Sequence, residues 1–300
     1  MRRPRLIAAL ALAASSVTGC AAATPAGHSE AAPLLVKPSH PSKVLVVVEE
    51  NHTERSALAG MPYLASLAKA HGRASSYRAI THPSLPNYLA IAGGSTFGVH
   101  DDRPPASHHD PGPSAFDRAI GSGHTAKTYA EAMPSPCAQS STGLYAVKHN
   151  PWTYFSDATS SASCRRYDVP AGTTAAGALR HDVDAGVLPN VGVLIPDICH
   201  DGHDCSLATA DSWLEGWLTR VQQGPDYRAG RLAVVVTFDG DDAAGNNTVL
   251  TVVASPYTRS VVSTRAYTHY SLTRYFAEVV GTWPLRAAAT APSVQADFGL

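Results

Sequence analysis

Two short segments carry the side chains with the clearest chemical potential. Glu50 and Asn51 follow the apolar, β-branched run 44–48, which is typical of a buried strand. The octet 81–88, THPSLPNY, presents the hydroxyl of Ser84 at a stiff turn between two prolines. Hard oxygen ligands at a strand end, followed by a rigidly held serine, suit metal-assisted phosphoryl transfer. The octet also fits a capped helix start, with Ser84 as the N-cap and a proline in the first turn.

Three further polar clusters follow predicted strands or begin a predicted helix. They are the acidic and histidine-containing run 197–204, the group 238–242 that contains Asp239, and His269. A single cluster of this kind is usually a turn or a structural histidine. In an open α/β sheet, however, the carboxyl ends of the strands converge on one crevice. We therefore expect these side chains to meet there.

Carboxylate and carboxamide oxygens favour a divalent cation such as Mg²⁺, Mn²⁺ or Ca²⁺. Such an ion would lower the pKa of a serine hydroxyl and neutralise charge on a phosphoryl oxygen. His203 and His269 would hold the remaining phosphoryl oxygens or protonate the leaving group, which predicts a mildly acidic pH optimum. The ligands expected for the ion are Glu50, Asn51, Asp239 and the Ser84 oxygen.

Strand-like and helix-like patterns alternate along the chain. This order predicts an α/β fold with a mostly parallel central sheet flanked by helices on both faces. About 250 residues suit one core, so we expect a single domain over 43–300. Residues 100–113 are expected to form a loop. The expected strands are 44–48, 191–195, 232–237 and 248–254, and the expected helices are 61–70, 173–184, 212–222 and 269–280.

The N-terminus has the features of a targeting segment. Residues 1–19 combine three arginines with an apolar stretch that is too short to span a bilayer. They end in VTGC, which resembles a bacterial lipobox with Cys20 as the lipidated residue; an ordinary signal peptide is the alternative. Residues 20–42 are rich in Ala, Pro and Ser and are expected to form a flexible tether. We expect a cell-surface lipoprotein or a secreted protein, with membrane contact only through the lipid anchor.

Excluding Cys20, four cysteines remain, an even number for an oxidising compartment. Of the three pairings, the shortest loops favour Cys137–Cys164 and Cys199–Cys205. A zinc site is the alternative, although the spacings contain no paired CxxC motif. Without the targeting segment, 20 Lys and Arg (23 minus three arginines) face 24 Asp and Glu, a net charge of about −4. No basic run is visible, which argues against nucleic-acid binding.

Five segments resemble, in order, the phosphoesterase family of bacterial phospholipases C and secreted acid phosphatases, which is related to alkaline phosphatase. The likeness covers most of residues 43–286 and implies an alkaline-phosphatase-like fold. It is strongest to secreted acid phosphatases that act on phosphatidylinositol 3-phosphate. The segments are 46–53 (VVVEENHT), 81–90 (THPSLPNYLA), 148–152 (KHNPW), 199–205 (CHDGHDC) and 268–272 (THYSL).

The resemblance implies a metal-dependent phosphomonoesterase with a phosphoserine intermediate on Ser84. Its partner would be a small phosphorylated substrate or a phospholipid headgroup, and we expect a monomer. The resemblance implies that Glu50, Asn51 and Asp239 bind the metal, the same residues that the strand-end pattern indicates. By the same likeness, His203 and His269 bind the phosphoryl group, His82 lies close by, and His149 and His200 are neighbours.

One position departs from the family pattern. The family has Trp-Asp-Glu after the 232–237 strand, whereas this chain has Phe238-Asp239-Gly240. The missing glutamate is expected to be a metal ligand, and Asp241 or Asp242 is the available replacement because Gly240 permits unusual backbone angles. Two alternatives stay open for this reason and because of the family's breadth. One is a phosphodiesterase of the phospholipase C type, and the other is a catalytically impaired surface lipoprotein that binds phosphorylated ligands.

Overall fold

The structure, a computed structural model, describes residues 38–300 except 109–111, 156 and 244–245. Residues 1–37 lie outside the described residues, together with the predicted targeting segment and Cys20. The strands of the main sheet are β1 Lys43–Glu49, β2 Gly72–Ala74, β4 Ala126–Ala130, β5 Asp168–Pro170, β6 Val191–Ile195, β7 Leu232–Phe238, β8 Thr251–Ala254 and β9 Val261–Ser263. A separate parallel pair is formed by β3 Tyr77–Arg78 and β10 Tyr267–Thr268.

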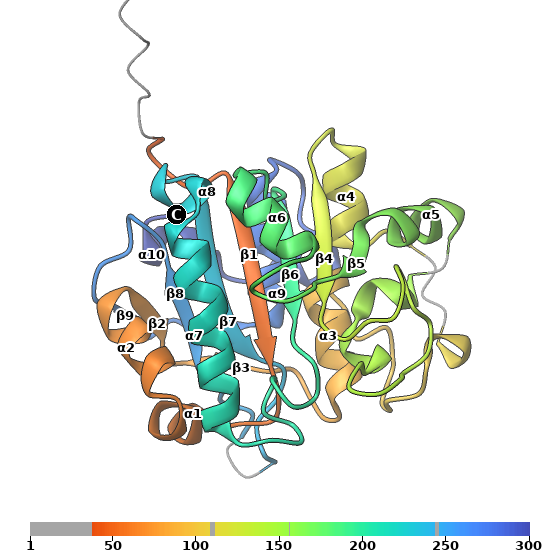
Figure 1. Cartoon of the computed structure of the whole chain (residues 1–300), viewed down its shortest axis with the longest axis horizontal. Helices are drawn as coiled ribbons and strands as arrows, with labels where there is room; N and C mark the ends of the chain where they lie inside the picture. Colours follow the sequence, from red (N-terminus) through yellow and green to blue (C-terminus); the bar gives the residue numbers. More distant parts are fainter. Residues whose placement is uncertain (1–37, 109–111, 156, 244–245) are drawn as a thin grey trace, which may run out of the picture. The chain divides into compact units, whose positions relative to one another are not determined.

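The main sheet has eight strands in the order β5-β4-β6-β1-β7-β8-β2-β9. The five strands β5, β4, β6, β1 and β7 pair in parallel in that order. Among the described strands of this sheet, only β8 is antiparallel to its neighbours, β7 and β2. The predicted mostly parallel sheet is therefore confirmed. The first strand, β1, lies between β6 and β7 in the interior of the sheet (Figure 1). Its continuous apolar sequence follows from burial on both faces.

Helices cover both faces of the sheet, as predicted. Figure 1 shows α6 and α7 in front of the strands and α9 behind them. The helices are α1 Glu54–Gly60, α2 Pro62–Ala70, α3 Ser84–Gly93, α4 Ala115–Gly121, α5 Ala158–Tyr167, α6 Ala178–Ala185, α7 Leu207–Gln223, α8 Pro225–Arg228, α9 His269–Val279 and α10 Gln295–Phe298. The 3₁₀ turns are η1 Pro105–Ser107, η2 Val147–His149, η3 Pro151–Tyr154 and η4 Arg286–Ala289.

The helix expected over 173–184 was predicted too long, because α6 begins only at Ala178. Residues 173–176 form a closed turn in which the Thr173 and Ala176 backbones bond to each other. The turn ends at Gly177, whose φ of 123° is poorly tolerated by other residues. The strand expected over 248–254 was also too long, since β8 starts at Thr251. Helix α7, in contrast, starts before the expected 212, because Ser206 caps it by accepting from the Thr209 N–H.

Both predicted disulfides are formed. Cys137 pairs with Cys164, and Cys199 pairs with Cys205. The second bridge closes the loop between β6 and α7, and the first joins the segment after β4 to α5. Within the residues that the structure describes, no helix is long and apolar enough to cross a membrane.

Candidate functional site

Three of the predicted metal ligands meet at the ends of β1 and β7. The two strands are parallel, with Glu49 opposite Phe238, so the next residues, Glu50 and Asp239, emerge side by side. The backbone N–H of Asn51 donates to Asp239 Oδ1 at 3.1 Å, and its side-chain amide donates to Glu50 Oε2 at 2.7 Å. Asn51 adopts a φ of 48°, which turns the chain at the strand end. The strand register thus brings these oxygens together, as the sequence indicates.

Ser84 joins this group from helix α3. Its Oγ donates to Glu50 Oε2 at 2.8 Å, and the residue is only 3% exposed. The helix expected as the alternative interpretation of the octet is present. However, the N-cap is Pro83, and Ser84 is the first helical residue. The idea that Ser84 caps the helix is therefore wrong, because its hydroxyl donates to the carboxylate of Glu50, just after β1, and not to the helix backbone.

The donor set fits a hard divalent cation. Glu50 Oε1 and Asp239 Oδ2 are buried and have no hydrogen-bond partner among the described residues. Burial, followed by the charges of Asp239 and Asp201, raises the pKa of Glu50 well above its usual value, and burial also raises the pKa of Asp239. Buried carboxylates in this condition need a compensating positive charge or a proton. A cation held by Glu50, Asn51, Asp239 and Ser84 meets that need.

His149 lies closer to this group than the sequence indicates. Its Nε2 is 3.2 Å from Glu50 Oε1, and its Nδ1 is 3.1 Å from Asp201 Oδ2. The ring stacks on Tyr88 with centroids 5.2 Å apart. Burial lowers the pKa of His149 to about 3, so the ring is neutral and does not balance the carboxylate charge. The KHNPW motif was the only signal for this residue, and Asp201 and Tyr88 had no predicted role.

The three predicted catalytic histidines occupy different environments. His203 is exposed, with its ring 6.0 Å from that of His149 and its Nδ1 2.7 Å from Asp204. His269 is fully buried, and both of its nitrogens are engaged. Its Nε2 lies 2.6 Å from the Asp239 carbonyl oxygen, and its Nδ1 lies 3.1 Å from the Tyr77 hydroxyl. Burial lowers the pKa of His269 to about 4, so the ring donates to the carbonyl as a neutral imidazole.

His82 and Asp241 flank the position where the family glutamate is missing. His82 Nε2 lies 3.0 Å from Asp241 Oδ1. The Asp241 carboxylate also accepts from the backbone N–H groups of Ala243 and Asn247. A Cβ atom at Gly240 would lie 3.2 Å from the His82 ring. Asp241 thus fixes the loop after β7 and orients His82, whose ring packs against the glycine. Asp242 is exposed.

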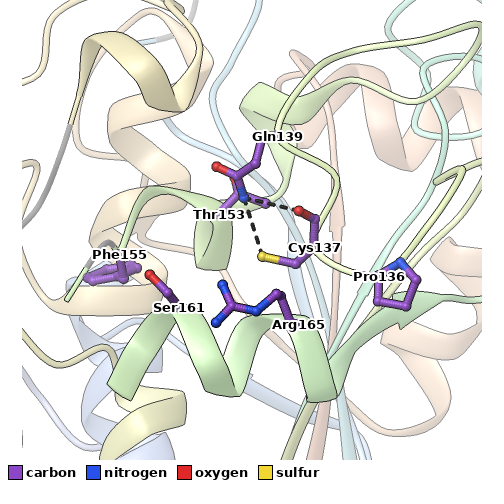
Figure 2. A pocket seen from close by; sticks show the side chains of 7 residues that line it. All are labelled: Pro136, Cys137, Gln139, Thr153, Phe155, Ser161 and Arg165. Atoms are coloured by element: carbon purple, nitrogen blue, oxygen red, sulfur yellow. Dashed lines mark hydrogen bonds between the residues drawn. The ribbon is translucent and has the colours of Figure 1, made fainter. Parts of the chain in front are cut away.

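A separate pocket of about 380 Å³ lies beside the first disulfide (Figure 2). Its polar lining includes Gln139, whose amide donates to the carbonyl oxygen of Cys137, and the guanidinium of Arg165. None of the predicted catalytic or metal-binding residues lines it. The candidate site is therefore the buried group at the ends of β1 and β7 and not this pocket.

Known phosphatases are similar to this chain in sequence. The phosphatidylinositol-3-phosphatase of Mycobacterium tuberculosis is 29% identical over 259 residues, which cover 85% of this chain and 82% of that protein. The phosphate-repressible acid phosphatase of Penicillium chrysogenum is 30% identical over 223 residues, covering 70% of this chain and 52% of that protein. These relatives are named phosphatases, in line with the resemblance in the five motifs.

Solved structures support the fold assignment. A protein of the alkaline phosphatase superfamily from Vibrio parahaemolyticus has a TM-score of 0.56 at 11% identity, covering 89% of this chain and 73% of that one. A lipoteichoic acid synthase from Listeria monocytogenes has a TM-score of 0.52 at 9% identity, covering 84% and 77%. The fold is thus that of the alkaline phosphatase superfamily. Because the model of the phosphoesterase family matches residues 55–281, this chain belongs to the phosphoesterase family and is a hydrolase of phosphoric ester bonds.

Proposed function

We propose that this protein is a metal-dependent phosphomonoesterase of the acid phosphatase type that acts through a phosphoserine on Ser84. The observation that carries the proposal is the 2.8 Å contact between Ser84 Oγ and Glu50 Oε2 inside a buried carboxylate site. A serine nucleophile needs an acceptor for its proton and stabilisation of the phosphoryl charge. Glu50 supplies the acceptor, and the orphaned oxygens of Glu50 and Asp239 support a cation for the charge.

The ion would be Mg²⁺, Mn²⁺ or Ca²⁺, held by Glu50, Asn51, Asp239 and Ser84. When bound, it would acidify the serine hydroxyl and neutralise a phosphoryl oxygen. Hydrogen bonds within the protein already orient these ligands before an ion binds. The two N–H donors of Asn51 orient both carboxylates, and His269 holds the Asp239 backbone through its carbonyl oxygen.

The histidines near the site have different proposed roles, which follow from how exposed each ring is. His203, which is exposed beside His149, is placed to protonate the leaving oxygen and to contact the phosphoryl group from the solvent side. His82 presents a half-exposed ring at the edge of the site, oriented by Asp241. His269 acts as a positioning residue for Asp239, because both of its nitrogens are engaged by the protein.

Hydrolysis of p-nitrophenyl phosphate between pH 4 and 9 tests this proposal. EDTA should abolish turnover, and one of the three ions should restore it. Ser84→Ala should reduce kcat by about a thousandfold or more, because the nucleophile is lost. The matched control is Ser66→Ala, since Ser66 is exposed on α2 and its hydroxyl donates to the Tyr63 carbonyl, away from the site. Undiminished activity in Ser84→Ala would sink the mechanism.

Gly240 favours a second candidate, a phosphate-binding protein with impaired catalysis. Losing one anionic ligand weakens a site of this kind, and the space beside Gly240 is taken by His82. Calorimetric binding of phosphate in the presence of metal, without any turnover, would support the binding protein. Robust turnover would end it.

The substrate class follows from the relatives' names only as a proposal. We propose that phosphoinositides phosphorylated at the 3-position are hydrolysed at Ser84. Vesicles that contain phosphatidylinositol 3-phosphate should release inorganic phosphate. Faster cleavage of phosphatidylcholine to a phosphorylated headgroup would instead identify a phosphodiesterase of the phospholipase C type.

We further propose that the protein works outside the cytoplasm, anchored through a lipid on Cys20. The two disulfides support an oxidising compartment. Metabolic labelling with a radioactive fatty acid should mark the wild-type chain and not Cys20→Ala. Equal labelling of both would contradict the anchor.

A further inference from the structure

A second cluster of metal-binding side chains lies beyond the ends of β4 and β6. It consists of Glu131, Asp197 and His200, each with a ligand atom within 4.8 Å of the others. His200 Nδ1 is 2.9 Å from Glu131 Oε2 and 3.4 Å from Asp197 Oδ1. Ligands about 2.0–2.2 Å from a metal are about 3.3–3.6 Å apart at tetrahedral angles and about 2.8–3.1 Å apart at right angles, so both separations fall within the range of a coordination shell.

Hydrogen bonds and a stacking contact hold the three side chains in place. Trp213 Nε1 donates to Glu131 Oε1 at 3.0 Å, and the Trp213 ring stacks on His200. The backbone N–H groups of Cys199 and His200 donate to Asp197 Oδ1. Supporting hydrogen bonds of this kind orient the ligands in protein metal sites.

A buried carboxylate without a hydrogen-bond partner lies on the same face of the sheet as Glu131. Glu49 is fully buried, and neither of its carboxylate oxygens has a hydrogen-bond partner within the described part of the chain. Val47 and Tyr129 both pair with Leu194, so the residues two positions on, Glu49 and Glu131, project from the same face of the sheet.

The charges in this region are not balanced by the protein. The acids Glu49, Glu131, Asp197, Asp201 and Asp211 have no ion pair with a lysine or arginine among the described residues. Among the described residues, the basic side chains within 4 Å of their carboxylates are the imidazoles of His149, which is neutral, and His200. Asp211 accepts hydrogen bonds from two backbone N–H groups at the start of α2. These neutral donors stabilise Asp211 but add no positive charge for the other four acids. Uncompensated buried carboxylates are costly, and a bound cation removes that cost.

We propose that Glu131, Asp197 and His200 bind a second divalent cation, a transition metal of the Zn²⁺ or Mn²⁺ type. An imidazole nitrogen with two carboxylates suits these ions better than Mg²⁺ or Ca²⁺. His200 lies within the segment closed by Cys199–Cys205, which also carries Asp201 and His203, and Asp197 lies two residues before that segment. The ion would therefore fasten this segment to the end of β4 and keep Asp201 beside His149.

Metal stoichiometry tests the proposal. The purified protein is stripped with EDTA, dialysed against Zn²⁺ or Mn²⁺, and its bound metal is counted by mass spectrometry. Glu131→Gln and His200→Gln should each lose one ion per chain relative to wild type. The matched control Glu215→Gln, an exposed residue on the same helix as Trp213, should lose none. Glu50→Gln should lose the ion of the proposed catalytic site while the ion at Glu131 is kept.

A second measurement does not depend on any variant folding well. Co²⁺ added to the wild-type protein should give visible absorption typical of mixed nitrogen and oxygen ligation, and Zn²⁺ should displace it. Near-ultraviolet circular dichroism of each variant identifies those that are folded. Unchanged stoichiometry in a folded Glu131→Gln and a folded His200→Gln would overturn the proposal, as would the absence of a Co²⁺ spectrum. The cluster would then be a hydrogen-bonded group, with a proton where the ion is proposed.

Discussion

Asp168, the first residue of β5, should make the stability of this protein depend on pH. It is fully buried and accepts hydrogen bonds from the Thr128 hydroxyl and from the Asn150 side-chain amide at 2.8 Å. Burial raises its pKa from 3.8 to about 7, although both hydrogen bonds act in the opposite direction. Asn150 directly follows His149, so the network that holds this acid also holds part of the candidate site.

The sign follows from proton binding. Between pH 3.8 and about 7, the folded protein keeps a proton on Asp168 that the unfolded chain has lost. The free energy of unfolding is therefore highest below this interval and falls as the pH rises through it. The interval is about 3.2 pH units, and at about 1.36 kcal/mol per unit the loss is about 4 kcal/mol. Asp168→Asn carries no charge at any pH and removes this slope.

Urea unfolding of wild type and Asp168→Asn at pH 4 and pH 8 measures the effect. At pH 4 the difference in unfolding free energy reports how well the amide replaces the protonated acid. At pH 8 the difference should have moved by about 4 kcal/mol in favour of the variant. The exposed Glu215→Gln serves as the control. A wild-type-to-variant difference that is the same at both pH values would refute the reasoning.

Four further variants test the supports of the site and the fold. Breaking Cys137–Cys164, which spans 27 positions, should lower the unfolding free energy by about 3.6 kcal/mol, and breaking Cys199–Cys205, which spans 6, by about 2.2 kcal/mol. The reverse order in urea unfolding would contradict the loop-entropy argument. Tyr77→Phe removes the bond to His269 Nδ1 and should cost about 1–3 kcal/mol in urea unfolding; no loss would show that this bond is not needed. Asp211→Ala leaves the first N–H groups of α2 unpaired and should lower the melting temperature through a loss of about 1–2 kcal/mol; an unchanged melting temperature would exclude this capping role.

The part of the site built from strand ends could be predicted from the sequence. Glu50 and Asp239 each follow a run of buried β-branched residues, and parallel pairing then requires them to be neighbours. The pairing of the cysteines followed from loop length in the same way. In both cases a local pattern fixes the geometry, because little other structure intervenes.

The remainder depends on contacts that no local pattern encodes. His149 lies on the short 3₁₀ turn η2, and its position is set by stacking on Tyr88, which is far away in the sequence. Strand β4 was not expected, since its sequence AKTYA contains a lysine whose charge is paired with Asp182 of α6. The helix predicted over 173–184 was longer than the observed α6, because the alanine-rich composition of this segment gives no sign of the turn that ends at Gly177.

The central position of β1 has a consequence for how the chain folds during synthesis. The first strand to be made is completed only by β6 and β7, whose pairing partners begin at Val191 and Leu232. More than half of the described chain must therefore leave the ribosome before β1 gains its first neighbour, and still more before the second. Until then its edges are unpaired and its valines are exposed, which is the state that holding chaperones recognise. Truncation from the C-terminal side should for this reason yield aggregated chains instead of smaller folded units.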